Sequence, residues 1–168
     1  MPENSADPGV RGKTLVVCCD GTWNTADQKG SPTNVTKLTR AILKRSPEGR
    51  PQIVYYDEGV GTGNRWDRWW GGALGLGLNK NVQRAYRFLA LNYEEGDRIA
   101  LFGFSRGAFT VRSLAGLVGS VGLLKKGDLD RMPDIWTHYR TPPAQRGMID
   151  PDWIACRPDI DPLGVWDT

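Results

Sequence analysis

The sequence has very few of the residues from which metal sites and disulfide frameworks are built. Its 168 residues include one histidine and three cysteines. Cys18 and Cys19 are adjacent within an apolar run, so their side chains point to opposite faces, and the sequence contains no Cys-x-x-Cys spacing. A zinc site needs several such ligands at short spacings, and a disulfide framework needs paired cysteines. We therefore expect reduced thiols and neither a metal nor a cofactor.

Long hydrophobic runs and blocks of one charge are also missing. Residues 1–13 are polar, without the apolar core of a signal peptide, and no apolar stretch approaches the length of a membrane span. The net charge of +3 includes no concentrated basic block, which argues against nucleic acid as a partner. We expect a disordered leader over residues 1–13 and one domain over 14–168. A cytoplasmic location follows, with export by a contact-dependent secretion system left open.

Apolar runs alternate with helical patterns along the chain. Four short runs predict strands, over residues 14–19, 53–56, 98–102 and 163–168. Helical spacing of apolar residues predicts helices that start near residue 32, cover residues 82–93 and follow residue 105 directly. Two segments interrupt the pattern: an excursion over 64–78, and a loop-rich insertion over 125–162 with a short helix near 135–139. This alternation predicts an α/β fold with a mostly parallel sheet.

Polar residues follow each predicted strand. The strands lead into Asp20, Asp57, Ser105 and Asp167. Because the carboxyl ends of parallel strands meet at one edge of a sheet, and such edges hold the working residues, we expect these side chains to share a site. Asp20 and Asp57, with Gly61 from the glycine-rich turn 59–63, are expected to form its rim.

The pentapeptide around Ser105 matches the G-x-S-x-G pattern of a nucleophile elbow, since Gly103 and Gly107 flank it. The bare pattern is weak evidence, but here an apolar strand precedes the serine directly and an apolar-periodic helix follows it. Glycines suit a turn in which backbone segments approach closely. The start of a helix offers amide groups to an oxyanion, and the Arg106 amide is the expected first donor.

Four motifs in the same order resemble one family. They are residues 20–24 (Asp-Gly-Thr-Trp-Asn), 55–63, 103–108 and 164–168. Together they are similar to the largely uncharacterised α/β-hydrolase family that includes type VI secretion phospholipase effectors, with a Tle-type catalytic domain. The resemblance implies a sheet of the α/β-hydrolase type, incomplete at its C-terminal end in this chain. It also implies a serine hydrolase acting on carboxylic esters, with phospholipids among the candidate substrates.

The resemblance further implies a Ser-Asp-His triad. Carried onto this sequence, Ser105 is the nucleophile and Asp167 the orienting acid, so the histidine is expected beyond Thr168. The histidine that is present, His138, lies between them in the wrong order, and we expect it to pack at the surface or in a loop. As written, the chain is expected to lack its general base, and a serine without a base is a poor nucleophile at neutral pH.

Three other interpretations stay open at this point. The Asp20-Gly21-Thr22 turn suggests a haloacid-dehalogenase-like phosphatase, although Cys18 stands where that chemistry needs an aspartate. In a hydrolase the Gly21 or Thr22 amide would be the second oxyanion donor, unless Asp20 makes only a local turn hydrogen bond. The fold could also serve as a binding module without catalysis. Separately, an aromatic cluster suggests transient contact with a membrane surface through Trp66, Trp69 and Trp70.

Overall fold

A four-stranded, all-parallel sheet forms the centre of the molecule. The computed structural model describes residues 11–21, 31–58 and 74–166, with side chains from residue 79 onward in the last stretch. The sheet order is β2-β1-β3-β6. Its strands are β1 (Thr14–Cys19), β2 (Gln52–Asp57), β3 (Arg98–Phe104) and β6 (Ile160–Trp166). The mostly parallel α/β sheet predicted from the sequence is confirmed.

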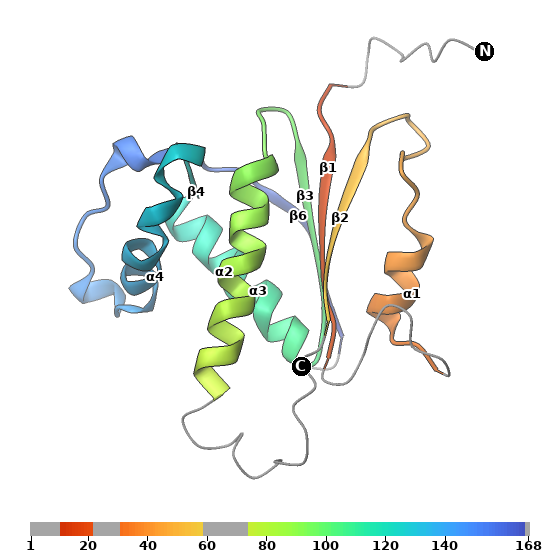
Figure 1. Cartoon of the computed structure of the whole chain (residues 1–168), viewed down its shortest axis with the longest axis horizontal. Helices are drawn as coiled ribbons and strands as arrows, with labels where there is room; N and C mark the ends of the chain where they lie inside the picture. Colours follow the sequence, from red (N-terminus) through yellow and green to blue (C-terminus); the bar gives the residue numbers. More distant parts are fainter. Residues whose placement is uncertain (1–10, 22–30, 59–73, 167–168) are drawn as a thin grey trace.

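Helices cover both faces of this sheet (Figure 1). Helix α1 (Asn34–Ala41) lies on one face, while α2 (Leu74–Asn92) and α3 (Arg106–Val121) lie on the other. Strand β1 supplies both interfaces, because successive side chains of a strand point to opposite faces. Leu15 and Val17 join the cluster under α2 and α3, whereas Val16 and Cys18 join the smaller cluster under α1. Burial on both faces explains why this strand is continuously apolar.

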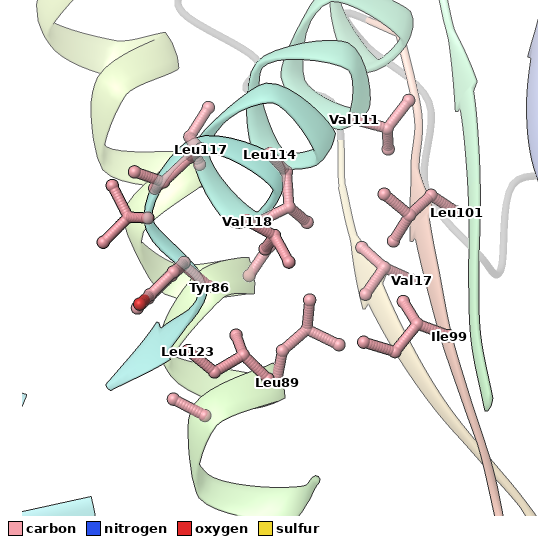
Figure 2. Close-up of a cluster of buried hydrophobic side chains, with 14 of the residues drawn as sticks. Val17, Tyr86, Leu89, Ile99, Leu101, Val111, Leu114, Leu117, Val118 and Leu123 are labelled. Carbon is pink, nitrogen blue, oxygen red and sulfur yellow. The ribbon is translucent and has the colours of Figure 1, made fainter. Parts of the chain in front are cut away.

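The larger cluster holds α2 and α3 against the sheet. Figure 2 shows Val17, Ile99 and Leu101 of the sheet facing the side chains that α2 and α3 turn toward them. Tyr86 is fully buried there, and its hydroxyl donates to the Gly122 carbonyl at 2.8 Å and accepts from the Leu124 amide at 2.9 Å. The Tyr86 hydroxyl therefore fixes the turn that follows α3 to the middle of α2.

A small subdomain follows α3 and lies beside α2 and α3, away from α1 (Figure 1). Strands β4 (Leu123–Leu124) and β5 (Ile154–Cys156) pair in antiparallel fashion within it. Its helices are α4 (Met132–Arg140) and the 3₁₀ turns η2 (Lys126–Arg131), η3 (Pro143–Gln145) and η4 (Pro151–Trp153). The short helix predicted near 135–139 is confirmed and is longer at its N-terminal end. The β4–β5 pair was not predicted, because strands of two and three residues carry no periodicity.

Three boundaries differ from the sequence prediction. Helix α2 begins at Leu74, so residues 74–78 belong to a helix and not to the predicted excursion; glycines at 75 and 77 obscure the helical spacing. Strand β6 begins at Ile160, three residues early, and contains Pro162, which an edge strand tolerates because it leaves amides unpaired. Lys13 was assigned to the leader, but Asp97 holds it in place. The Asp97 carboxylate accepts from the Lys13 amide at 2.8 Å and forms an ion pair with the Lys13 ammonium at 2.6 Å.

Candidate active site

Ser105 occupies a strained position between β3 and α3. Its backbone angles are φ 53° and ψ −116°, and it is the only residue other than glycine with positive φ in the described part of the chain. An L-residue adopts such angles at a cost of about 1–3 kcal/mol, and they persist where the surroundings enforce them. The Ser105 side chain is exposed and does not cap α3. Its hydroxyl therefore projects from a tight turn at the carboxyl edge of the sheet.

The two flanking glycines make this turn sterically feasible. A side chain on Gly103 would collide with the Gly107 carbonyl group and come within 2.7 Å of the Ala108 Cα atom. A side chain on Gly107 would collide with the Cys19 carbonyl group and come within 2.9 Å of the Asp20 carbonyl oxygen. Only hydrogen fits at both positions. The G-x-S-x-G spacing is thus explained by contacts in this structure.

Helix α3 and strand β6 both hold the Ser105 backbone. The Ser105 carbonyl accepts from the Ala108 amide at 3.0 Å and from the Phe109 amide at 3.3 Å, which closes the first turn of α3. The Ser105 amide donates to the Trp166 carbonyl at 3.1 Å. Arg106 begins α3, so its amide stands at the positive end of the helix dipole. Asp167 directly follows the residue that binds the Ser105 amide, although Asp167 itself lies outside the described residues.

Asp20 is the centre of a buried hydrogen-bond network. It is 4% exposed, and one carboxylate oxygen accepts from the Gly21 amide at 2.7 Å. Three hydroxyl groups donate to its other oxygen: those of Thr33 and Thr36, each at 2.7 Å, and that of Tyr56 at 2.8 Å. These bonds replace the water that a buried carboxylate loses. Asp20 thereby joins the end of β1 to the start of α1 and to β2.

The sequence analysis did not find the three hydroxyl partners of Asp20. Thr33 is the N-cap of α1, and its hydroxyl also accepts from the Thr36 amide at 3.0 Å. A Thr residue three positions before another Thr at a helix start is a usable signal for a cap. No such signal points to Tyr56, which pairs in register with Cys18 on the neighbouring strand. Its approach to Asp20 depends on the pairing of β1 with β2.

Asp57 lies at the same edge, at the end of β2, and β1 separates β2 from the strand that leads to Ser105. It pairs in register with Cys19, and its carbonyl accepts from the Asp20 amide at 3.0 Å. Burial, aided by the charge of Glu58 and opposed by Arg84, raises the pKa of Asp57 from 3.8 to about 6. Burial also raises the pKa of the Cys19 thiol well above its ordinary value, with the charge of Asp57 acting in the same direction. Cys19 therefore stays a protonated, inert thiol at neutral pH.

His138 is far from Ser105. It lies on α4 next to Tyr139, whose hydroxyl would be 2.6 Å from a side chain built on Gly116 of α3. Gly116 is eleven residues beyond Ser105, which corresponds to about 16 Å along a helix. A general base must come within hydrogen-bond reach of the nucleophile. His138 thus belongs to the small subdomain, as a helix residue of α4.

The structure brings together the described members of the predicted edge: Asp20, Gly21, Asp57, Ser105 and Arg106. The other predicted site residues, Thr22, Gly61 and Asp167, and the aromatic cluster of Trp66, Trp69 and Trp70, lie outside the described residues. Over 11–21, 31–58 and 74–166, no group of three acidic, histidine or cysteine side chains is arranged to hold a metal ion. Over the same ranges, no helix is long and apolar enough to cross a membrane.

A parallel sheet with a strained serine between a strand and a helix at its carboxyl edge is typical of the α/β-hydrolase class. Comparison with protein families agrees with this geometry. Residues 13–168 match the family described as "T6SS, Phospholipase effector Tle1-like, catalytic domain". The chain belongs to this family, and the resemblance noted from its four motifs is confirmed.

A curated relative comes from Saccharomyces cerevisiae (strain ATCC 204508 / S288c). The chain is 33% identical over 150 residues to its "Uncharacterized protein YEL023C". The alignment covers 81% of this chain and 22% of the yeast protein, so the chain spans about a fifth of that relative's length. No solved structure matches the chain.

Proposed function

We propose that this domain hydrolyses carboxylic esters by acyl transfer through Ser105. The observation that carries the proposal is the conformation of Ser105: a serine at φ 53°, between two glycines that no other residue can replace, at the start of a helix. A serine in an ordinary strand-to-helix turn needs none of these features. Strain of this kind is typical of functional sites, where it aims a side chain out of the turn.

The roles of the surrounding groups follow from this geometry. The Ser105 oxygen attacks the ester carbonyl, and the Arg106 amide at the start of α3 donates to the oxyanion that forms. The Gly21 amide already donates to the Asp20 carboxylate, so we assign the second oxyanion donor to Thr22. Collapse of the tetrahedral intermediate expels the alcohol, and water then releases the acid from the acyl-enzyme.

The proton of the Ser105 hydroxyl needs an acceptor. In the family's order of Ser, Asp and His, we assign Asp167 as the acid that orients the base and place the base in polypeptide that follows Asp167. The link from the Ser105 amide to Trp166 supports this assignment, since it puts the chain leading to Asp167 beside the nucleophile. The position of His138 on α4, in the small subdomain, argues against His138 as this base.

Membership of a phospholipase effector family supports an acyl ester of a phospholipid as the substrate. We also propose that Trp66, Trp69 and Trp70 take part in contact with the lipid surface, because indole rings suit the headgroup level. A phosphatase with Asp20 as nucleophile is not supported, since both oxygens of this carboxylate accept hydrogen bonds and the side chain is buried.

A fluorophosphonate probe tests the nucleophile directly. The full-length protein should be labelled, and Ser105→Ala should abolish labelling without changing the circular dichroism spectrum. Ser113→Ala is the matched control, because Ser113 lies on the same helix beyond the elbow, and its labelling should equal that of the wild type. Labelling that survives Ser105→Ala, or hydrolysis of phospholipid by that variant at the wild-type rate, would refute the proposal.

A further inference from the structure

The side of the sheet that carries α1 has a surplus of positive charge. Residues 31–56 contain five lysine and arginine residues and one glutamate, a surplus of four positive charges, although the whole chain carries only +3. Residues 123–161 contain six lysine and arginine residues against seven aspartates. Figure 1 shows that these segments lie on opposite sides of the sheet, with α1 on one side and α4 on the other. The segment that includes α1 is therefore more positive than the small subdomain.

No run of basic residues reveals this arrangement in the sequence, because the cations are spaced along α1 and the turn after it. We use the name basic edge for Lys37, Arg40, Leu43, Lys44 and Arg45, all of which are exposed. Lys37, Lys44 and Arg45 take part in none of the ion pairs formed within the described residues. Over the described ranges, no carboxylate forms an ion pair with these three exposed cations.

The one acidic residue of the segment does not neutralise the basic edge. The Ser46 hydroxyl and the backbone amide of Glu48, followed by the charges of Arg98 and Arg50, lower the pKa of the Glu48 carboxyl. Glu48 is therefore an anion whose cationic neighbours are Arg50 and Arg98. Arg50 in turn donates to the Gly96 carbonyl at 3.2 Å.

The turn that carries Leu43, Lys44 and Arg45 is rigidly held. The Gln52 amide donates to the Lys44 carbonyl and the Gln52 side chain to the Leu43 carbonyl, at 2.9 and 3.0 Å. Arg45 forms an antiparallel bridge with Pro51, and its guanidinium donates to the Gly49 carbonyl at 2.8 Å. This scaffold presents Leu43 with 66% of its surface exposed, among the cations. Order in the turn means that little conformational entropy is lost when the edge binds a partner.

We propose that the basic edge binds the surface of an anionic lipid bilayer. An apolar side chain set among lysine and arginine residues matches the requirements of an interface: the cations contact anionic headgroups and the apolar group enters the boundary below them. The basic edge also starts near the site, because the N-cap of α1, Thr33, donates to Asp20. Helix α1 runs from there to the opposite edge of the sheet, where Leu43 and Lys44 accept hydrogen bonds from Gln52 at the start of β2. The inference rests on the proposed function only in so far as the bound lipid is also the substrate.

Co-flotation with vesicles tests this surface. Full-length protein carrying Ser105→Ala, so that no lipid is consumed, is mixed with vesicles of phosphatidylcholine with or without phosphatidylglycerol. We expect binding to the anionic vesicles only, and weaker binding at high salt. The double variant Lys37→Gln/Lys44→Gln should weaken binding about 25-fold, since each cation near an anionic surface contributes about fivefold. The matched control Lys125→Gln/Lys126→Gln removes the same charge from the opposite side and should bind as the parent does.

A variant of Leu43 distinguishes a bilayer from an acidic protein as the partner of the basic edge. Leu43→Ser should weaken vesicle binding several-fold without a change in charge, whereas Met148→Ser, at an even more exposed site in the small subdomain, should not. Equal loss in the two lysine double variants, or equal binding to both vesicle types, overturns the proposal. Loss with the lysine variants but none with Leu43→Ser also overturns it and favours an acidic protein surface.

Failure of this proposal and failure of the proposed function can be told apart. Lys37→Gln/Lys44→Gln with Ser105 intact should hydrolyse a soluble short-chain ester at the unchanged rate, because neither lysine contacts the site. Hydrolysis of that ester without charge-dependent vesicle binding would refute membrane binding by the basic edge and would still support the proposed hydrolase. Charge-dependent vesicle binding without any hydrolysis would refute the proposed hydrolase and would still support membrane binding by the basic edge.

Discussion

Gly107 lies directly against the carbonyl group of Cys19, at the point where α3 starts beside the end of β1. A Cβ atom at Gly107 would come within 2.5 Å of the Cys19 carbonyl carbon, a distance that no side chain reaches. The contact is between two backbones, so neither side can move away by changing a rotamer. The start of the helix that carries Ser105 is thus fixed to the central strand by close approach alone.

We predict that Gly107→Ala unfolds the protein more easily. The added methyl group forces α3 away from β1, and such overpacking costs about 1–3 kcal/mol. Because Gly107 is two residues from Ser105, fluorophosphonate labelling should fall as well. Urea unfolding followed by circular dichroism measures the first effect.

Gly119→Ala is the matched control for Gly107→Ala. Gly119 lies on the same helix, with nothing within 4 Å of the position of its missing Cβ atom. Alanine forms helices better than glycine, so this variant should gain about 0.5–1 kcal/mol in unfolding free energy. If both variants changed stability in the same direction, the close contact of Gly107 with Cys19 would be wrong.

We predict that Asp20→Asn lowers the unfolding free energy by about 2 kcal/mol or more. The carboxylate accepts four hydrogen bonds, and an amide group offers one oxygen while its NH₂ group meets hydroxyl donors. Thr36→Val, which removes one of these donors, should cost less. Asp159→Asn, at an exposed carboxylate, should leave the urea midpoint unchanged. A loss in Asp159→Asn equal to that in Asp20→Asn would contradict a special role for the buried network.

The stability of the protein should depend on the titration of Asp57. Burial raises the folded-state pKa of Asp57 from 3.8 to about 6, so the folded protein retains a proton that the unfolded chain has lost. More protons are bound in the folded state between these values, and the contribution of Asp57 to stability therefore falls as pH rises from about 4 to about 6. Above about pH 6 the Asp57 carboxylate is ionised in both states, and the free energy lost by its partial burial no longer changes with pH.

Asp57→Asn should remove this pH dependence. The unfolding free energy of the variant minus that of the wild type is expected to be larger at pH 7.5 than at pH 4, because asparagine stays neutral throughout. Urea unfolding at both pH values gives the difference. Asp161→Asn, at an exposed position, should show no such trend. A wild-type advantage that grows with pH would mean that the folded state lowers the pKa of Asp57.

The sequence predicted the parts of this molecule that depend on local pattern. Apolar runs gave β1, β2 and β3 with small errors at their ends, and the elbow around Ser105 followed from residue types at fixed spacing. The partners of Asp20 did not follow, because Tyr56 reaches it only through the register of β1 against β2. The basic edge was not predicted because its four cations are spread over residues 37–45 without forming a continuous basic block. Patterns within one element are readable, whereas contacts between elements need the fold.

The strain at Ser105 makes a last prediction that does not require catalysis. Ser105→Gly should be more stable than Ser105→Ala by about 1 kcal/mol or more, because glycine adopts φ 53° and ψ −116° freely while alanine keeps the Cβ atom that disfavours them. Both variants lack the hydroxyl, so both should lose fluorophosphonate labelling, and only their urea midpoints should differ. In an unstrained helix start the order would be reversed, since glycine gains more entropy than alanine on unfolding. A higher midpoint for Ser105→Ala would therefore show that the residue is relaxed, and the main support for an elbow built to present a nucleophile would be lost.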